Sequence, residues 1–478
     1  MTFDELLAMV ASADAPEVRT DSRLVRPGDV FVAVRGAAVD GHDFIDQAVA
    51  NGAQYVVYQE DHSPNHATHA HVVVADSASA VGKLAQASRA NPAARLTNLA
   101  VTGTNGKTTV AFLVHACIKH TGAGCGLLGT VVYDTGAGIA SASLTTPDPL
   151  TIAEMQQRMV HAGATYMIAE ASSHALSQDR LAGIDFRAAA FTNLSGDHLD
   201  YHKTRDSYLA AKTRLFTALA PDATAVLNRQ APEANAIAQQ TQAKVLWYAV
   251  DEPADVSAHV ESMTVEGTRF TLEYGGQTAP VSTPLLGKYN VANHLAAAGL
   301  CLAAGFGLPT VAAGLSSLQA IPGRLEKIGH APFGVIIDYA HTDDALQNVL
   351  STLKPLCAGR LIVVFGCGGD RDRTKRPRMA QAAERFAELV VVTSDNPRSE
   401  DPKAIINDII GGLADPTSQA AVIEPDREKA ITLAIGQARQ TDIVLIAGKG
   451  HENYQIIGEQ RLHFSDKEVA LRALEAGG

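Results

Sequence analysis

The sequence has few cysteines and no excess of positive charge. Its five cysteines, at positions 117, 125, 301, 357 and 367, form no Cys-x-x-Cys pair, so we expect neither a disulfide framework nor a thiolate zinc site. Lysine and arginine number 39 against 51 aspartates and glutamates, which gives a formal net charge of −12. This balance argues against a nucleic-acid-binding protein or one that binds an anionic membrane over a broad basic surface. An anionic substrate would need local cations or backbone N–H groups.

Signals for export and for membrane insertion are also missing. The N-terminus is acidic where a signal peptide would be basic. The stretch from Tyr289 to Gly323 contains no charged residue, but Gly305–Pro309 interrupts it. It therefore predicts core helices at 291–304 and 309–319 rather than a membrane span. We expect a cytoplasmic protein that inserts into no membrane.

The order of apolar runs predicts an α/β protein with three domains. A chain of 478 residues is long enough for about two to four domains, and its hydrophobic content of 46% is typical of a globular protein. Residues 1–88 hold short β-rich runs and predict a small α/β domain. Residues 89–320 alternate apolar strands with helices, typical of a mainly parallel sheet covered on both faces. Residues 321–478 repeat strand, turn and helix, which predicts a doubly wound, Rossmann-like domain. The expected strands are 30–34, 55–58, 72–75, 99–102, 127–133, 166–171, 188–193, 224–228, 244–248, 335–338, 361–365, 389–393 and 443–447.

The most specific motif is Val-Thr-Gly-Thr-Asn-Gly-Lys-Thr-Thr at 101–109, which lies between an expected strand and an expected helix. Gly103 and Gly106 allow a tight turn whose N–H groups can face phosphate oxygens. Lys107 can reach the β- and γ-phosphates, and the Thr108 hydroxyl can bind Mg²⁺. Because valine rather than glycine opens the motif, the loop is shorter than in GTPases and most kinases. It predicts an ATP site; the alternative is a glycine-rich turn that contains a lysine by coincidence.

This loop resembles that of the Mur ligase superfamily, which also includes folylpolyglutamate synthases. Other motifs along the chain resemble the same family. They are Thr20–Ala33, Gly36–His42, Leu144–Pro147, Glu170–Leu176, Asn193–Asp200, Tyr208–Lys212, Gly287–His294, Pro322–Glu326 and Asp338–His341. The resemblance implies that the first domain binds a UDP-sugar, the central domain ATP and the last domain an amino acid.

The resemblance also implies a nucleotide and metal site in the central domain. Its catalytic residues would be Lys107, Glu170, His198 and Lys212. Mg²⁺ would be held by Thr108, Glu170, His198 and an N-carbamylated Lys212. ATP would contact Gly103, Thr104, Asn105, Gly106, Lys107, Thr108, Thr109, Asn293, Arg324, Asp338 and His341.

The residues alone leave simpler interpretations of this site open. Glu170 could pair with a neighbouring cation, and His198 could be an ordinary loop residue. Lys212 could be a solvated lysine on an amphipathic helix over 208–216. Arg324 and Asp338 could belong to interdomain salt bridges.

A second substrate site, for the UDP-muramoyl-dipeptide, is implied by the resemblance alone. Its residues would be Ser22, Ala37, Ala38, Val39, Thr145, Thr146, Ser172, Gln178 and Arg180. Arginine can grip a carboxylate or phosphate with two parallel hydrogen bonds. The loop residues 37–39 can offer only backbone or shape, and the hydroxyls could equally be helix N-caps.

Polar residues follow three expected strands of the last domain, at 366–371, 395–398 and 448–452. The carboxyl ends of parallel strands share one edge of a sheet, so these residues should converge. Arg371 and Arg398 suit carboxylates, and Asp395 and Glu452 suit ammonium groups. Asp-Asn-Pro-Arg also resembles the signature of ligases that add meso-2,6-diaminopimelate, although Asp-Asn-Pro could simply initiate a turn. The implied pocket comprises Arg371, Asp395, Asn396, Pro397, Arg398, Gly448 and Glu452.

The resemblance therefore implies an ATP- and Mg²⁺-dependent amide ligase. It would add meso-2,6-diaminopimelate to UDP-N-acetylmuramoyl-L-Ala-D-Glu through an acyl phosphate, in peptidoglycan precursor synthesis, releasing ADP and phosphate. We expect a monomer whose partners are these small-molecule substrates. The alternatives are a lysine-adding or folylpolyglutamate-type ligase, disfavoured by Arg398 and by the UDP-sugar pattern respectively, and a non-catalytic nucleotide-binding regulator.

Overall fold

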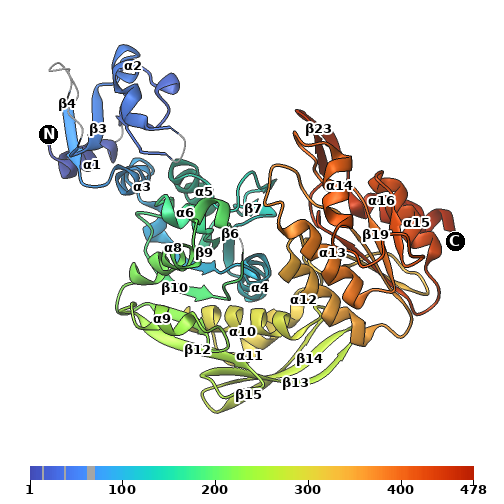
Figure 1. Ribbon diagram of the computed structural model, residues 1–478. Coiled ribbons are helices and arrows are strands. Elements are labelled where there is room, and N and C mark those ends of the chain that lie inside the picture. The colour runs from blue at the N-terminus through green and yellow to red at the C-terminus, as the bar shows by residue number, and fades with distance from the viewer. Residues whose placement is uncertain (13–14, 37–38, 62–69, 197, 478) are drawn as a thin grey trace.

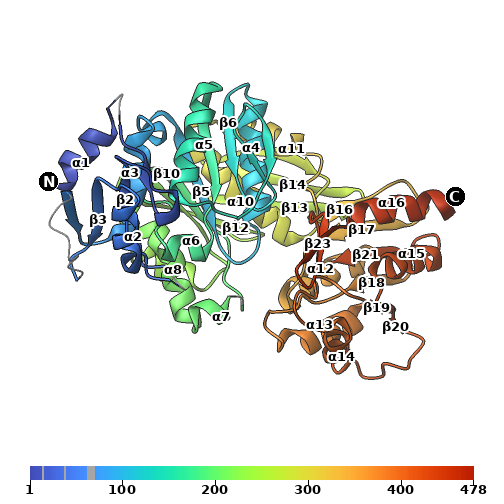
Figure 2. The same cartoon turned by 90° about the horizontal axis from the view of Figure 1, so that it is seen from above.

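The computed structural model describes residues 1–12, 15–36, 39–61, 70–196 and 198–477. In this part of the chain, sheets of four, eleven and six strands with their helices follow one another from the N-terminus to the C-terminus (Figures 1 and 2). The predicted fold class is therefore confirmed. We propose the limits 1–88, 89–320 and 321–478 for the three domains.

The N-terminal unit is a small parallel sheet with helices packed against it. Its strands, in sheet order, are β1 (Val18–Arg19), β2 (Val30–Val32), β3 (Tyr55–Gln59) and β4 (Ala70–Val74). Its helices are α1 (Phe3–Val10), α2 (Ile45–Ala50) and α3 (Ser77–Ser88). Leu6 and Val10 of α1 pack with Val30 and Val32 of the sheet, which places α1 over its core.

The central unit is built on an eleven-stranded sheet in the order β15-β14-β13-β12-β11-β10-β5-β9-β6-β7-β8. The strands are β5 (Thr97–Thr102), β6 (Gly124–Leu128), β7 (Val132–Asp134), β8 (Ile139–Ser141), β9 (Ala164–Glu170), β10 (Phe186–Phe191), β11 (Thr224–Asn228), β12 (Lys244–Val250), β13 (Val256–Thr264), β14 (Gly267–Tyr274) and β15 (Gln277–Thr283). The helices are α4 (Lys107–His120), α5 (Pro149–His161), α6 (Ser173–Ser177), α7 (Leu199–His202), α8 (Arg205–Thr217), α9 (Ala234–Ala238), α10 (Lys288–Ala303) and α11 (Leu308–Ser317).

Helices cover both faces of the parallel part of this sheet. Leu99 and Val101 of β5 pack with Leu295 of α10, whereas Ala100 between them packs with Met159 of α5 on the opposite face. Strands buried on both faces need apolar residues at every position, which is why their runs were recognisable in the sequence. The uncharged stretch forms α10 and α11, close to the predicted helices. No helix in the described ranges is both long and apolar enough to span a bilayer.

The central sheet differs from the prediction in one strand and has three further strands that were not predicted. The run 127–133 is not one strand: β6 ends at Leu128, and the chain turns through Gly129 and Thr130 before the antiparallel strand β7 begins. Strands β13, β14 and β15 form an antiparallel extension of the sheet that was not among the expected strands. Their burial alternates, as expected for strands with one covered face, so no continuous apolar run marks them.

The C-terminal unit has a six-stranded sheet in the order β16-β17-β21-β18-β19-β20, in which only the β16–β17 pair is antiparallel. Its strands are β16 (Glu326–Lys327), β17 (Gly334–Asp338), β18 (Leu361–Phe365), β19 (Leu389–Val392), β20 (Ala421–Ile423) and β21 (Ile443–Ala447), followed by the hairpin β22 (Tyr454–Ile457) and β23 (Gln460–His463). Its helices are α12 (Asp343–Leu353), α13 (Lys375–Phe386), α14 (Pro402–Ile410), α15 (Arg427–Gln437) and α16 (Asp466–Gly477). Since β18, β19 and β21 are parallel, their carboxyl ends share one edge, as predicted.

Candidate active site

The predicted phosphate loop connects β5 to α4. Gly103 and Gly106 have φ angles of 148° and 92°, a region that glycine tolerates and other residues rarely adopt. A Cβ atom at Gly103 would lie 1.8 Å from Thr192 Oγ1, and one at Gly106 would lie 2.3 Å from Asn293 Oδ1. Both positions therefore need glycine. The turn brings the chain to the N-terminus of α4, where backbone N–H groups favour an anion.

Two lysine ammonium groups converge on this loop. Lys107 Nζ donates to the carbonyl oxygens of Gly103 and Thr104, each at 2.8 Å. Lys212 Nζ donates to the same Gly103 oxygen at 2.7 Å and lies 4.3 Å from the centre of the Tyr208 ring. Because Lys212 is only 1% exposed, the interpretation as a solvated lysine is wrong. Its partner is 109 positions away in the sequence, so helical spacing alone could not reveal its burial.

Glu170 ends β9 and is fully buried, with 0% of its surface exposed. Its Oε1 accepts the Thr130 N–H at 2.8 Å, and its Oε2 accepts the hydroxyls of Thr130 at 2.9 Å and Thr108 at 3.1 Å. These hydrogen bonds come from a backbone N–H and hydroxyls, not from the basic side chain offered as the alternative. The carboxylate thus faces the first turn of α4.

The predicted metal ligands line one cleft: Thr108, Glu170, His198 and Lys212. Mg²⁺ is usually bound by one or two carboxylates together with substrate phosphates and water, not by a protein cage. Among the described residues, no three His, Cys, Asp or Glu side chains are grouped so that they could hold a metal ion. The buried Glu170 carboxylate beside the Thr108 hydroxyl therefore fits Mg²⁺ held jointly with a nucleotide.

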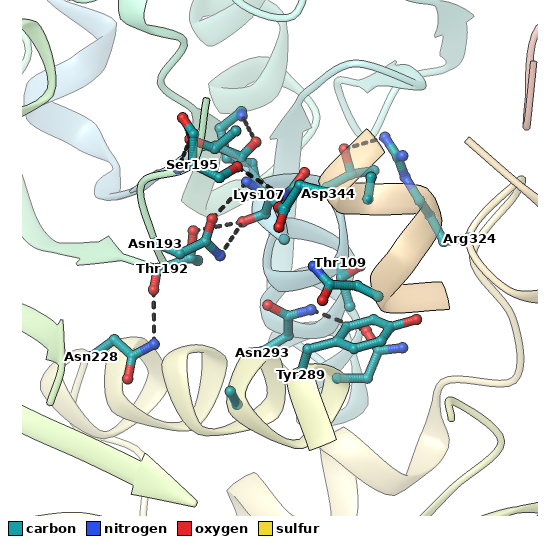
Figure 3. Close-up of a pocket in the computed structure, with 18 of the residues that line it drawn as sticks. Lys107, Thr109, Thr192, Asn193, Ser195, Asn228, Tyr289, Asn293, Arg324 and Asp344 are labelled. Atoms are coloured by element: carbon teal, nitrogen blue, oxygen red, sulfur yellow. Dashed lines mark hydrogen bonds between the residues drawn. The ribbon is translucent and has the colours of Figure 1, made fainter. Parts of the chain in front are cut away.

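Helix α10 supplies the opposite wall of the phosphate loop. Asn293 Nδ2 donates to Asn290 Oδ1 at 3.0 Å, and both side chains are buried. This bond directs Asn293 Oδ1 toward the Gly106 backbone, as the short distance from a Cβ there shows. Figure 3 shows Asn293 and Tyr289 on this helix, facing Thr109 of α4.

Three predicted nucleotide contacts come from the C-terminal unit. Arg324 Nη2 donates to Thr108 Oγ1 at 3.2 Å, so the arginine reaches the phosphate-loop helix rather than an interdomain salt bridge (Figure 3). Asp338 accepts the N–H groups of Leu325 at 2.7 Å and Ala340 at 2.8 Å. Burial raises the pKa of Asp338, although Arg324 and these two N–H groups act to lower it. His341 Nδ1 lies 2.9 Å from the Tyr339 carbonyl oxygen.

These groups enclose a cleft of about 800 Å³ between the central and C-terminal units, a volume suited to a nucleotide with part of a second substrate. The predicted site residues that line it are Thr104, Asn105, Gly106, Lys107, Thr108, Thr109, Thr145, Glu170, Ser172, His198, Lys212, Asn293, Arg324, Asp338 and His341.

The predicted dipeptide contacts of the central unit form a network beside Glu170. Thr146 Oγ1 donates to the Glu170 carbonyl oxygen at 2.7 Å, and Arg180 Nη1 donates to the Thr146 carbonyl oxygen at 2.8 Å. Arg180 also donates to Gln178 Oε1 through Nε at 3.0 Å and Nη2 at 2.7 Å. Ser172 caps α6, since its Oγ accepts the Ala175 N–H; its contact with the dipeptide stays a prediction.

The predicted UDP-sugar contacts lie in the N-terminal unit and outside the lining of this cleft. Ser22 Oγ donates to Gln47 Oε1 at 2.8 Å, and Val39 is exposed. Ala37 and Ala38 lie outside the described residues.

The predicted amino-acid pocket lies at the carboxyl ends of β18, β19 and β21. Asn396 Nδ2 donates to Glu452 Oε2 at 2.9 Å, which joins two of the three loops. Arg398 Nη1 donates to the Gly369 carbonyl oxygen at 2.7 Å and therefore reaches the third. A Cβ on Gly368 would lie 2.8 Å from Arg398 Nη1 and 3.9 Å from Arg371 Cγ, so both arginines flank this glycine. Gly448, with φ of 113°, allows the Asp395 carboxylate to approach its backbone.

Three residues of the site were not predicted. Thr130 holds Glu170 from the turn after β6, and Lys449 lies buried among the acids of the amino-acid pocket. Tyr339 lines the nucleotide cleft, while its hydroxyl donates to Glu452 Oε1 at 3.5 Å. Tyr339 thus connects the two sites. Lys449 lies in the motif 448–452 and Tyr339 in the motif Asp338–His341, but their chemistry depends on neighbours remote in sequence.

Family models match three consecutive segments of the chain between residues 16 and 450. Residues 16–89 match the Mur ligase family catalytic domain, residues 101–301 the Mur ligase middle domain, and residues 323–450 the Mur ligase glutamate ligase domain.

Individual relatives match over similar lengths. The UDP-N-acetylmuramoyl-L-alanyl-D-glutamate–2,6-diaminopimelate ligase of Geobacillus kaustophilus is 44% identical, with 97% of this chain and 96% of the relative covered. The enzyme of the same name from Gloeobacter violaceus is 43% identical, with 99% of this chain and 98% of the relative covered. A solved structure of a ligase with this name is 35% identical, with a TM-score of 0.71 and 100% and 99% of the two chains covered. MurF ligase from Thermotoga maritima, solved in complex with ADP, shares the fold at 19% identity, a TM-score of 0.62 and coverage of 99% and 98%. From the three consecutive domain matches and these full-length likenesses, the chain belongs to the Mur ligase family.

Proposed function

We propose that this protein is an ATP-dependent amide ligase that adds meso-2,6-diaminopimelate to UDP-N-acetylmuramoyl-L-Ala-D-Glu in peptidoglycan precursor synthesis. The observation that carries the proposal is that one residue contacts both predicted sites. Tyr339 lines the nucleotide cleft, and its hydroxyl contacts Glu452 of the amino-acid pocket. Relatives 44% and 43% identical carry the name of this ligase. We place the reaction in the cytoplasm, where ATP is available, and expect a monomer.

ATP would occupy the phosphate loop. Its phosphates would meet the loop N–H groups and the Lys107 ammonium, which offsets the charge that builds up on the transferred phosphoryl group. Arg324 already reaches the Thr108 hydroxyl, so the C-terminal unit would contribute a cation to the same phosphates. Asn293, Asp338 and His341 would contact the base and the ribose.

Thr108, Glu170 and His198 would hold Mg²⁺, which when bound neutralises phosphate charge and orients the oxygens. Thr130 keeps the Glu170 carboxylate directed at α4. Lys212 is the candidate for N-carbamylation, because its buried Nζ lies against the phosphate loop. A carbamate there would supply a further carboxylate to the metal.

The dipeptide substrate would extend from the N-terminal unit to the cleft. Ser22 and the loop 37–39 would contact the UDP-sugar. The dipeptide would be oriented so that its D-Glu γ-carboxylate reaches the γ-phosphorus of ATP. The residues that orient it would be Thr145, Thr146, Ser172, Gln178 and Arg180. Attack there gives an acyl phosphate and ADP. The walls that the two units contribute would limit the access of water to this reactive group.

Diaminopimelate would bind at the strand ends of the C-terminal sheet. Arg371 and Arg398 would receive carboxylates, and the acidic groups of the pocket an ammonium. The free amine of the substrate attacks the acyl carbon, phosphate leaves, and the nitrogen loses its proton to give the amide.

The proposal is tested by phosphate release from ATP in the presence of the UDP-dipeptide and Mg²⁺, with one amino acid added at a time. We expect release that depends on meso-diaminopimelate, and lysine should support little turnover because it has no distal carboxylate for Arg398. Release that depends on lysine, or on neither amino acid, would contradict the proposal.

A further inference from the structure

Lys449 is a buried cation that the proposed reaction leaves without a role. It lies between Gly448 and Gly450 at the carboxyl end of β21 and is 0% exposed. Lysine is almost never fully buried unless it is paired, because moving its charge out of water is costly. The groups around Lys449 must therefore offset the cost of burying its charge.

The Lys449 ammonium lies among the polar side chains of the amino-acid pocket. Nζ is 3.2 Å from Asn396 Oδ1, 3.3 Å from Glu452 Oε2 and 3.8 Å from Asp395 Oδ1. The Tyr454 ring centre is 5.5 Å from the same nitrogen. The two carboxylates predicted to bind a substrate ammonium thus already share one ammonium that belongs to the protein.

This contact fixes the side-chain amide of Asn396. Asn396 Oδ1 accepts from Lys449 Nζ and from the Ile456 N–H at 2.9 Å. With its oxygen directed there, Asn396 must present Nδ2 to Glu452 Oε2, where the bond is 2.9 Å. Glu452 Oε2 therefore accepts hydrogen bonds from protein donors. The other oxygen, Oε1, lies on the side of the Tyr339 hydroxyl and the nucleotide cleft. A rotated amide would set Nδ2 against the Lys449 ammonium.

The formal charges of this cluster leave one negative charge for the substrate. Asp395 and Glu452 contribute two negative charges and Lys449 one positive charge. Arg427 also acts on both carboxylates, but it is paired with Asp466 at 2.7 Å. Diaminopimelate has two amines, of which one must be the neutral nucleophile and the other can remain an ammonium. One net negative charge matches the single ammonium that the reactive form retains.

We infer that Lys449 is a positioning residue that brings the net charge of the acidic cluster to −1 and, through Asn396, orients the Glu452 carboxylate to receive a single substrate ammonium. The inference rests on the proposed function, since it deepens the account of the same pocket. Lys449 acts through Asn396 and Glu452 and is not assigned to the reacting atoms.

Steady-state kinetics of Lys449→Met and Lys449→Arg test this role, with diaminopimelate and ATP varied in separate series. For Lys449→Met we expect the KM for diaminopimelate to rise about ten- to a hundredfold, as for the loss of hydrogen bonds to charged groups, while the KM for ATP stays within about twofold. Lys449→Arg retains the charge and the donors, so its KM for diaminopimelate should fall between those of wild type and Lys449→Met. Should Lys449→Met not fold, Lys449→Gln replaces it, because it keeps a donor but removes the charge.

Lys354→Met is the matched control, because Lys354 forms an exposed ion pair with Glu388 in the same unit; neither KM should change. An unchanged KM for diaminopimelate in Lys449→Met would overturn the inference. So would equal rises in both KM values with no recovery in Lys449→Arg, which would indicate a purely structural role. If wild type does not use diaminopimelate at all, the proposed function itself fails, and this outcome is distinct from the other two.

Discussion

At the scale of single residues, the site depends on charged groups that are buried and held by neutral or backbone partners. The Glu170 carboxylate is bound by two threonine hydroxyls and one N–H, and Asp338 by two N–H groups. Such donors fix the direction of a carboxylate without cancelling its charge. Each group therefore remains available to a cation or to a ligand hydroxyl.

Glu170→Gln removes this charge while keeping the shape. The amide oxygen can still accept the Thr130 N–H, and the threonine hydroxyls can turn to accept from Nε2. We expect kcat for ADP release to fall by about a hundred- to a thousandfold, the range found when a group that stabilises the transition-state charge is removed. Glu154→Gln on α5, whose side chain is exposed, is the control. A kcat close to that of wild type for Glu170→Gln would contradict the assignment of Glu170 to the metal site.

Arg398→Ala tests the amino-acid pocket at the same scale. Arg398 has φ of 54°, and alanine carries the same Cβ, so the substitution adds no backbone strain. We expect the KM for diaminopimelate to rise by about tenfold or more through loss of a charge-assisted hydrogen bond, with the KM for ATP unchanged. Arg385→Ala, an arginine near the end of α13 next to the ring of Phe386, is the control. Equal rises in both KM values would mean that Arg398 only supports the fold.

At the scale of elements, the ends of parallel strands supply the site, and this much could be predicted from the sequence. Glu170 follows an apolar run, as do the loops after β18, β19 and β21. Strands covered on both faces leave a continuous apolar run, so their ends can be located. The antiparallel strands β13–β15 leave no such run, and neither does the turn at Thr130.

Contacts between segments remote in sequence could not be predicted, for a different physical reason. Helical or strand periodicity reports which face is apolar, but not which partner a buried polar side chain meets. Lys212 and Gly103 are 109 positions apart, and Tyr339 and Glu452 are 113 apart. Pairs of this kind depend on how whole elements pack, so the burial of Lys212 and Lys449 could not be predicted.

The helices α15 and α16 hold two loops of the predicted amino-acid pocket through one buried ion pair. Arg427 donates to Asp466 Oδ1 and Oδ2, each at 2.7 Å, and both side chains are 0% exposed. Arg427 also donates to the carbonyl oxygens of Ala447 at 2.9 Å and Ser394 at 3.4 Å, just before Gly448 and Asp395. The pair therefore anchors the ends of β21 and the loop after β19.

Arg427→Met should leave the Asp466 carboxylate buried and unpaired. We expect a loss of about 3–5 kcal/mol in the free energy of unfolding of the C-terminal unit, measured by urea denaturation. The double variant R427M/D466L should recover much of that loss, since no charge is then left unpaired. Arg472→Met, which removes an exposed ion pair with Glu428, should cost no more than about 1 kcal/mol. A similarly small loss for Arg427→Met would contradict the anchoring role.

At the scale of the whole molecule, residues of the central and C-terminal units together line the nucleotide cleft. Arg324 of the C-terminal unit reaches Thr108, and Asn105 Nδ2 of the central unit lies 3.3 Å from Asp344 Oδ2. A Cβ on Gly323 would lie 2.2 Å from the His451 N, so the chain between the two units packs tightly against the amino-acid pocket. The net charge of −12 is compatible with anionic substrates because a few local cations and N–H groups face the cleft.

The central claim is that this molecule couples ATP cleavage to amide formation with diaminopimelate. Its most direct test incubates the protein with ATP, Mg²⁺, the UDP-dipeptide and equal concentrations of meso-diaminopimelate and lysine, and identifies the nucleotide-linked product by mass spectrometry. We expect the diaminopimelate-containing UDP-tripeptide as the main product, formed in equal amount with ADP. A lysine-containing product, or ADP formed without any tripeptide, would contradict it.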